Sequence, residues 1–81
     1  MYYVYLLRDN KGKLYIGYSN NLKRRIREHA DRKVYTTSRM SGAKLIYYEA
    51  YTDKESAKIR ESKLKQFGSS YHGLIKRLGS R

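Results

Sequence analysis

The chain has 81 residues and a formal net charge of +12, with ten tyrosines and no cysteine. The lack of cysteine excludes a disulfide framework and thiolate metal sites. No stretch is apolar enough to span a membrane, and the N-terminus lacks a signal-peptide pattern, so we expect an intracellular, cytoplasmic protein. A chain of this length predicts one domain over 1–81. The charge is concentrated in 21–40, where seven Lys and Arg face two acids. Such a basic field points first to nucleic acid, and next to an anionic membrane or ribosomal RNA.

Three segments are typical of strands, and the apolar, aromatic run 2–8 predicts a strand that is covered on both faces. Turn residues at 9–13, including Gly12, separate it from a second strand at 14–19, so these two strands should form a hairpin. A third strand is expected at 44–51. With the helices below, the order is β-β-α-β-α-α, which predicts an α/β (α+β) domain with a small, three-stranded antiparallel sheet flanked by helices.

Three helices complete the prediction. The first covers about 21–31, the second runs from about 52 to Phe67 with Gly68 as its stop, and the third follows directly. A polar, basic loop is expected at 31–43. The expected N-caps are Asn20 or Asn21, then Thr52 in a capping box with Glu55, then Ser69 or Ser70.

The first helix places two ionisable side chains at the rim of the core. At 100° per residue, Leu22 and Ile26 face the core. Arg25 and His29 are four residues apart, so they share the face beside that apolar stripe. There an ionised group is held in place instead of moving freely in water. The alternative is that both are ordinary boundary residues, with His29 close to the helix C-terminus.

The second helix turns a carboxylate inward. Ala57, Glu61 and Leu64 lie on one helical face, and an ionised carboxylate on such a face is costly unless a cation meets it. A salt bridge to a neighbour such as Arg25 would satisfy Glu61. A Mg²⁺ ion held by one carboxylate, waters and substrate phosphate would also satisfy it. The residue pattern leaves both open.

The hairpin brings two tyrosines together if its turn is the five residues 9–13. Tyr5 then faces Gly17, and Tyr15 lies on the same side of the sheet as a diagonal neighbour of Tyr5. Gly17 would leave room beside the Tyr5 ring for a ligand or a close backbone. A turn with an even number of residues would separate the two tyrosines, and core packing is the alternative role for each.

Taken together, these positions resemble a known family. The motif residues are Tyr3-Val4-Tyr5, Tyr15-Ile16-Gly17, Asn21-Leu22, Arg25, His29, and Glu61 within AKIRESKLK. This pattern resembles the GIY-YIG nucleases, and is closest to their small single-domain members. The resemblance extends over nearly the whole chain.

The resemblance implies a small antiparallel sheet flanked by helices, and hydrolysis of phosphodiester bonds in DNA with Mg²⁺ or Mn²⁺. Carried over to this sequence, Glu61 would be the metal ligand and Arg25 would hold the scissile phosphate. Tyr5 and Tyr15 would include the base or the orienter of the attacking water. His29 would support that tyrosine or assist proton transfer.

Two positions depart from the family pattern. Tyr3 stands where the family has glycine, and the family asparagine near the C-terminal end has no counterpart. The residues that could take its place are Gln66, Ser69 and Ser70.

General contacts to DNA phosphates are expected from Lys23, Arg24, Arg27, Arg32, Lys33 and Arg39. We expect branched, nicked or single-stranded DNA as the substrate, in structure-specific cleavage or repair, with neither a membrane nor a small-molecule cofactor as partner. A catalytically inactive nucleic-acid-binding module with the same fold is the alternative.

Overall fold

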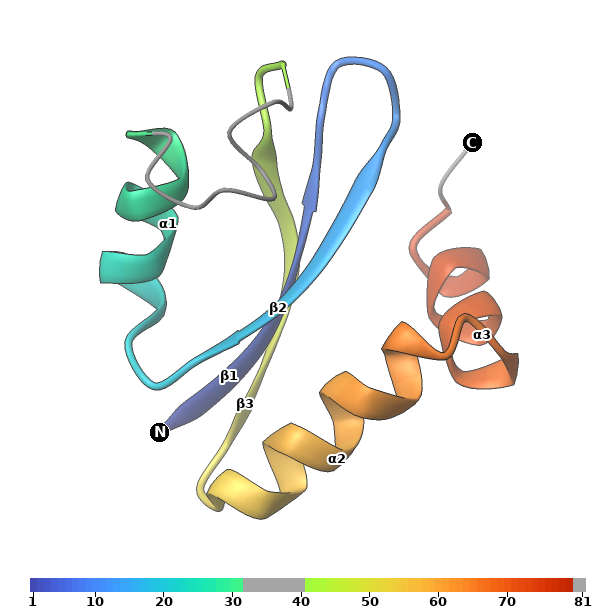
Figure 1. Cartoon of the computed structure of the whole chain (residues 1–81). Helices are drawn as coiled ribbons and strands as arrows, with labels where there is room; N and C mark the ends of the chain where they lie inside the picture. Colours follow the sequence, from blue (N-terminus) through green and yellow to red (C-terminus); the bar gives the residue numbers. More distant parts are fainter. Residues whose placement is uncertain (32–40, 80–81) are drawn as a thin grey trace.

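The computed structural model describes residues 1–31 and 41–79, and the account below concerns those residues. The predicted order of strands and helices is confirmed (Figure 1). Its elements are β1 (Tyr2–Arg8), β2 (Leu14–Ser19), α1 (Leu22–Ala30), β3 (Lys44–Tyr51), α2 (Lys54–Lys65) and α3 (Ser69–Arg77). The bounds of all three strands agree with those predicted.

The three strands form one antiparallel sheet in the order β2-β1-β3. The apolar run of β1 therefore lies in the centre, where both faces are covered, and Val4, Tyr5, Leu6 and Leu7 are all buried. β2 is an edge strand. The hairpin and the three-stranded antiparallel sheet are as predicted, whereas the place of β3 beside β1 was left open by the sequence. The β2 edge lies between helices on both faces.

The hairpin turn spans five residues, as predicted. The Asp9 carboxylate accepts hydrogen bonds from the backbone N–H groups of Lys11 at 2.9 Å and Lys13 at 2.7 Å. Gly12 has a φ of +83°, a left-handed conformation that costs glycine little. The odd length of this turn sets the pairing of Arg8 with Leu14, and every later pair of the hairpin follows from it.

The main core lies on the face of the sheet that α2 and α3 cover (Figure 1). Its centre consists of Val4, Leu6, Ile16, Ala57, Leu64 and Leu74. A polar clamp closes one side of this core, because the Arg60 guanidinium of α2 forms two hydrogen bonds of 2.9 Å to the Glu49 carboxylate of β3. Tyr47 and Tyr51 donate to the same carboxylate. No helix among the described residues is long and apolar enough to cross a membrane.

α1 lies on the opposite face of the sheet, so the prediction that Leu22 and Ile26 face the main core is wrong (Figure 1). Both are half-buried and line a separate apolar groove with Tyr3 and Tyr48. Helical periodicity defines the apolar side of a helix, but it does not say which face of the sheet that side covers.

The helix ends differ in detail from the prediction. Asn21 caps α1, as one of the two predicted choices. α2 is capped by Asp53, which accepts from the Ser56 N–H, so the capping box starting at Thr52 is wrong. The residue in the left-handed conformation after α2 is Phe67, with a φ of +55°, and not Gly68. Gly68 instead stands at the N-cap of α3 without a side-chain bond, which makes the predicted serine caps wrong as well.

Candidate active site

The hairpin register brings Tyr5, Tyr15 and Gly17 to the face of the sheet that α1 covers. Tyr5 pairs with Gly17, and Leu7 pairs with Tyr15, as the five-residue turn predicted. The space at Gly17 is filled by Tyr5 itself, since a Cβ on Gly17 would lie 2.4 Å from the Tyr5 Cζ and Oη. Glycine is therefore required here because the ring of the opposite strand lies across its backbone.

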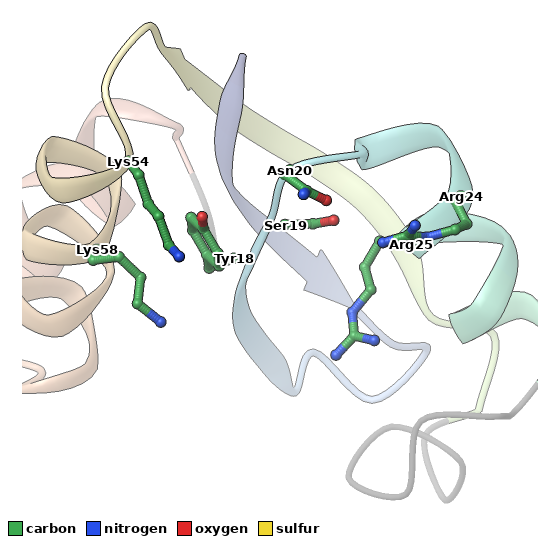
Figure 2. A pocket seen from close by; sticks show the side chains of 7 residues that line it. All are labelled: Tyr18, Ser19, Asn20, Arg24, Arg25, Lys54 and Lys58. Carbon is green, nitrogen blue, oxygen red and sulfur yellow. The ribbon is translucent and has the colours of Figure 1, made fainter.

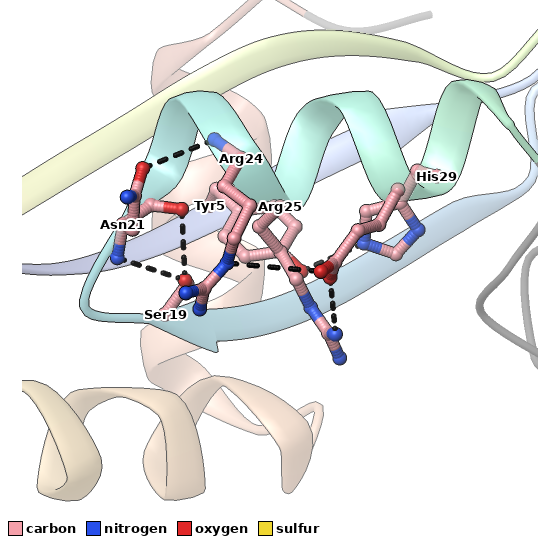
Figure 3. Close-up of polar contacts among 7 residues, drawn as sticks. Tyr5, Ser19, Asn21, Arg24, Arg25 and His29 are labelled. Carbon is pink, nitrogen blue, oxygen red and sulfur yellow. Dashed lines mark hydrogen bonds and ion pairs between the residues drawn. The ribbon is translucent and has the colours of Figure 1, made fainter.

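A hydrogen bond of 2.8 Å joins the Tyr5 hydroxyl of β1 to Nε2 of His29 in the last turn of α1 (Figure 3). Tyr5 is fully buried, and His29 is only 7% exposed. The half-buried Tyr15 ring packs against both, with centroids 6.3 Å from Tyr5 and 5.2 Å from His29. Three aromatic rings from β1, β2 and α1 thus form one cluster.

The environment keeps both members of the hydrogen bond neutral near pH 7. Burial raises the pKa of Tyr5 to about 12, against an opposing effect of the nearby Arg25 guanidinium. Burial also lowers the pKa of His29 below its ordinary value, and the positive charge of Arg25 adds to this. A neutral imidazole has one unprotonated nitrogen that can accept a hydrogen bond or a proton, so His29 can act as an acceptor here.

Arg25 presents an unsatisfied donor to this cluster. Its Nη1 donates to the Glu28 carboxylate at 3.0 Å, while its Nε is buried and has no hydrogen-bond partner within the described chain. The Tyr5 hydroxyl and then Glu28 raise the pKa of Arg25, so it stays cationic. A third of the Arg25 side chain is exposed, so the guanidinium can also meet an anionic ligand.

Glu61 reaches the site from the other face of the sheet. Its side chain is 16% exposed, and its Oε2 lies 3.0 Å from Nζ of Lys65 one turn later in α2. Of the two alternatives left open for Glu61, the structure shows a salt bridge, with Lys65 as the partner and not Arg25, which pairs with Glu28. The negative charge of Glu61 contributes to the raised pKa of Tyr5, so the two groups lie within electrostatic reach around the β2 edge.

The donor set at Glu61 limits which metal ion would fit. The described residues contain no cluster of three or more His, Cys, Asp or Glu side chains, which is unlike a zinc site. A single carboxylate does suit Mg²⁺ or Mn²⁺, because such ions keep several waters and take further oxygens from substrate phosphate. The ion pair with the half-exposed Lys65 is weak enough to be displaced.

A cationic cavity opens between α1 and α2 at the end of β2 (Figure 2). It has a volume of about 310 Å³. Its lining residues are Tyr18, Ser19, Asn20, Arg24, Arg25, Lys54 and Lys58. We call it the cationic groove. It contains four basic side chains and no acidic one, so its chemistry suits a phosphate group.

The structure thus gathers four of the five predicted catalytic residues on one face, and the fifth, Glu61, approaches around the β2 edge. Of the predicted DNA contacts, Arg24 lines the cationic groove, whereas Lys23 and Arg27 are exposed elsewhere on α1. Arg32, Lys33 and Arg39 fall outside the described residues. The possible substitutes for the family asparagine, Gln66, Ser69 and Ser70, do not line this groove.

Sequence reasoning missed Lys54 and Lys58. Lys54 and Lys58 are four residues apart, which places them on one face of α2, and Glu61 follows on that same face. The spacing of these two lysines could have been recognised from the sequence. Only the packing of α2 beside β2, however, shows that the face borders the Arg25 side of the molecule.

The chain matches the GIY-YIG catalytic domain over residues 1–72, and so it belongs to the GIY-YIG family. Within that family it is similar to UPF0213 proteins. The one from Streptococcus agalactiae is 39% identical over 66 residues, covering 79% of this chain and 74% of the relative. The one from Clostridium perfringens is 38% identical over 68 residues, covering 82% and 72%. A solution NMR structure of a UPF0213 protein from Bacillus halodurans shares 31% identity, with a TM-score of 0.59 over 96% of this chain and 85% of that one.

These comparisons confirm the predicted family and fold. The chain carries a GIY-YIG nuclease-like domain of the kind found in UPF0213 proteins, with the same three-stranded sheet and flanking helices. The names of these relatives assign no substrate or reaction to them.

Proposed function

We propose that this protein is a divalent-metal-dependent endonuclease that hydrolyses phosphodiester bonds in DNA. The observation that carries the proposal is the Arg25 guanidinium, a lasting cation that lies beside the Tyr5–His29 pair and lines a groove of four cations. A phosphate there would satisfy the guanidinium with charge-assisted hydrogen bonds. Membership of the GIY-YIG family supports a DNA substrate.

Exposure distinguishes the roles of the two tyrosines. Tyr15 is half-buried and Tyr5 is fully buried, so Tyr15 is the phenol that a water molecule can reach. In our proposal Tyr15 orients or deprotonates the attacking water. Tyr5 and the neutral His29 support it by ring packing, and when Tyr15 is the base, His29 takes the Tyr15 phenol proton so that the phenolate can receive the proton of the water.

Arg25 and Glu61 act on the phosphate from two sides. Arg25 binds the non-bridging oxygens and stabilises the charge that develops on them in the transition state. Glu61 holds the divalent ion, which when bound helps to neutralise the phosphate and the leaving oxygen. Lys65 pairs with Glu61 until the ion displaces it.

We further propose branched, nicked or single-stranded DNA as the substrate, in structure-specific cleavage or repair, with 1–81 acting as one domain in the cytoplasm. The small size of the site supports a structure-specific substrate, because such a site contacts backbone phosphates and recognises the shape of the DNA. Residues from α1, β2 and α2 offer cations and hydroxyls, and backbone contacts of this kind carry no base sequence.

Cleavage of a panel of DNA structures in Mg²⁺, Mn²⁺ or EDTA tests the proposal. Wild type should cut only with metal, and Arg25→Gln and Glu61→Gln should each lose roughly 100-fold or more in rate. Two matched controls, Arg27→Gln on α1 and Glu55→Gln on α2, remove the same charges from exposed positions and should cut normally. Equal rates in all five proteins would show that the residue assignment is wrong.

A second candidate function is a non-catalytic nucleic-acid-binding module. The observation that favours it is the cationic groove, which contains no acid and suits phosphate with or without cleavage. It becomes the better account if wild type binds DNA in a salt-sensitive manner but cuts no structure in either metal.

The two tyrosines give a finer test. Tyr15→Phe should lower kcat at unchanged stability, whereas Tyr5→Phe should lower both, because it breaks the buried bond to His29. Full activity in Tyr15→Phe, with a folded but inactive Tyr5→Phe, would instead assign the base to Tyr5.

A further inference from the structure

Four charged side chains form a row along the face of α2 that borders the β2 edge. Lys54, Lys58, Glu61 and Lys65 follow at steps of four, three and four residues, so they fall within about 60° of one another around the helix. Glu61 is thus flanked on both sides by lysines. Lys65 forms an ion pair with it, whereas Lys54 and Lys58 form none within the described residues.

Lys54 and Lys58 extend into the same opening that Arg25 enters from α1 (Figure 2). The acidic groups on the helix turns beside these cations already have partners, and Glu61 is paired with Lys65. Glu28 pairs with Arg24 and Arg25, and Asp53 caps α2. The groove therefore keeps its positive charge, and two of its four cations belong to α2.

The position of Lys58 is fixed by an aromatic ring. Its Nζ lies 4.7 Å above the centre of the Tyr18 ring, a cation–π contact that holds the ammonium over the end of β2. Ser19 contributes the floor of the groove, and its hydroxyl is bonded to Asn21 at the cap of α1. The groove is thus built from three elements whose relative positions the fold determines.

We propose that Lys54 and Lys58 each bind a backbone phosphate beyond the one held by Arg25, so that a DNA strand crosses the end of β2 from α1 to α2. The choice of the Arg25 phosphate as the scissile one depends on the proposed function. The binding of DNA backbone by these lysines does not. Along this path Glu61 lies one helical turn beyond Lys58, so the lysines align the strand with the carboxylate.

The proposal makes α2, and not the outer face of α1, the second half of the DNA-binding surface. Exposed cations such as Lys23 and Arg27 then contribute only to the long-range field. Single phosphates would bind weakly, since the groove is open and each cation gains from a neighbour on the same strand.

The test is a salt series of DNA binding, in EDTA so that no cleavage occurs, using a labelled nicked duplex. The double variant Lys54→Gln/Lys58→Gln should reduce the slope of log K against log salt by about 1.8, because each lost phosphate contact removes about 0.9. At 0.1 M salt its affinity should fall roughly 10- to 60-fold. The matched control is Lys63→Gln/Lys76→Gln, which removes the same charge: Lys63 projects on the opposite side of α2, and Lys76 is exposed on α3.

Each possible outcome either supports or overturns the inference. A slope equal to that of wild type, or an equal loss in the control, overturns the inference even if the protein cuts DNA. The expected loss in a protein that never cuts DNA upholds the inference while the proposed function fails. If millimolar inorganic phosphate displaces DNA from wild type as efficiently as competing DNA does, the groove is an isolated anion site and the strand path is wrong. With an active protein, the double variant should raise KM and leave kcat close to wild type.

Discussion

Gly17→Ala tests the geometry of the site most directly. The new Cβ would lie 2.4 Å from both Cζ and Oη of Tyr5, about 1 Å inside ordinary contact. The Tyr5 ring cannot yield easily, because it is fully buried and packed by the rings of Tyr15 and His29. A shift of that size would also stretch the 2.8 Å bond to His29 beyond hydrogen-bond range.

The expected cost combines two opposing effects. Overpacking of this kind costs about 1–3 kcal/mol, and the loss of a buried hydrogen bond adds about 1 kcal/mol. Replacing a glycine within a strand returns about 0.5–1 kcal/mol of backbone entropy. We therefore expect Gly17→Ala to lower the free energy of unfolding by about 1–3 kcal/mol and to reduce cleavage by more than its loss of folded protein explains.

Urea unfolding measures the loss of stability, and cleavage rates measure the loss of activity. Gly73→Ala is the matched control, since Gly73 lies in α3 with open space around it, and it should gain up to about 1 kcal/mol. In a Tyr5→Leu background, Gly17→Ala should cost much less, because the opposing ring is gone. Wild-type stability and activity in Gly17→Ala alone would refute the reasoning.

Three further predictions concern the charges of the fold. The pKa of His29 is lowered in the folded protein, so as the pH falls this imidazole takes up a proton more readily in the unfolded chain. Stability should therefore fall as the pH drops below about 6.5. In a pH series of urea midpoints, His29→Gln should flatten that part of the curve. The pKa of Tyr5 is raised to about 12, so stability present below pH 10 should be lost between pH 10 and 12. Tyr5→Phe should remove only part of this loss, since the pKa values of Tyr47 and Tyr51 are also raised. Glu49→Gln should cost about 1–2 kcal/mol in thermal unfolding by weakening the clamp to Arg60, and an unchanged Tm would show that the clamp contributes nothing.

The sequence was sufficient for the sheet because local chemistry determines it. The Asp9 turn has an odd number of residues, which fixes the hairpin register and the shared face of Tyr5 and Tyr15. The uninterrupted apolar run around Leu6 predicted a strand that is covered on both faces, and in the structure this strand is the central one. The Arg25 and His29 spacing likewise followed from helical periodicity alone.

What could not be predicted depends on tertiary packing. Thr52 and Asp53 are both good N-cap residues, so local preference does not choose between them. Phe67 adopts the left-handed conformation although Gly68 follows, and its ring packs against Tyr71 with centroids 4.8 Å apart. The partner of Glu61 was equally open, because several cations were within plausible reach before the position of α2 was known.

The Tyr5–His29 bond also fastens the end of α1 to the central strand. In many enzymes, removing a catalytic group relieves strain and makes the fold more stable, so activity and stability are traded against each other. Here a change that weakens the Tyr5–His29 pair would lower both activity and stability, because the same atoms that would serve the reaction hold a helix in position. Sequence drift that loosens α1 would therefore disable the site before the chain unfolds, and selection for activity would maintain the docking of α1 without any separate pressure on stability.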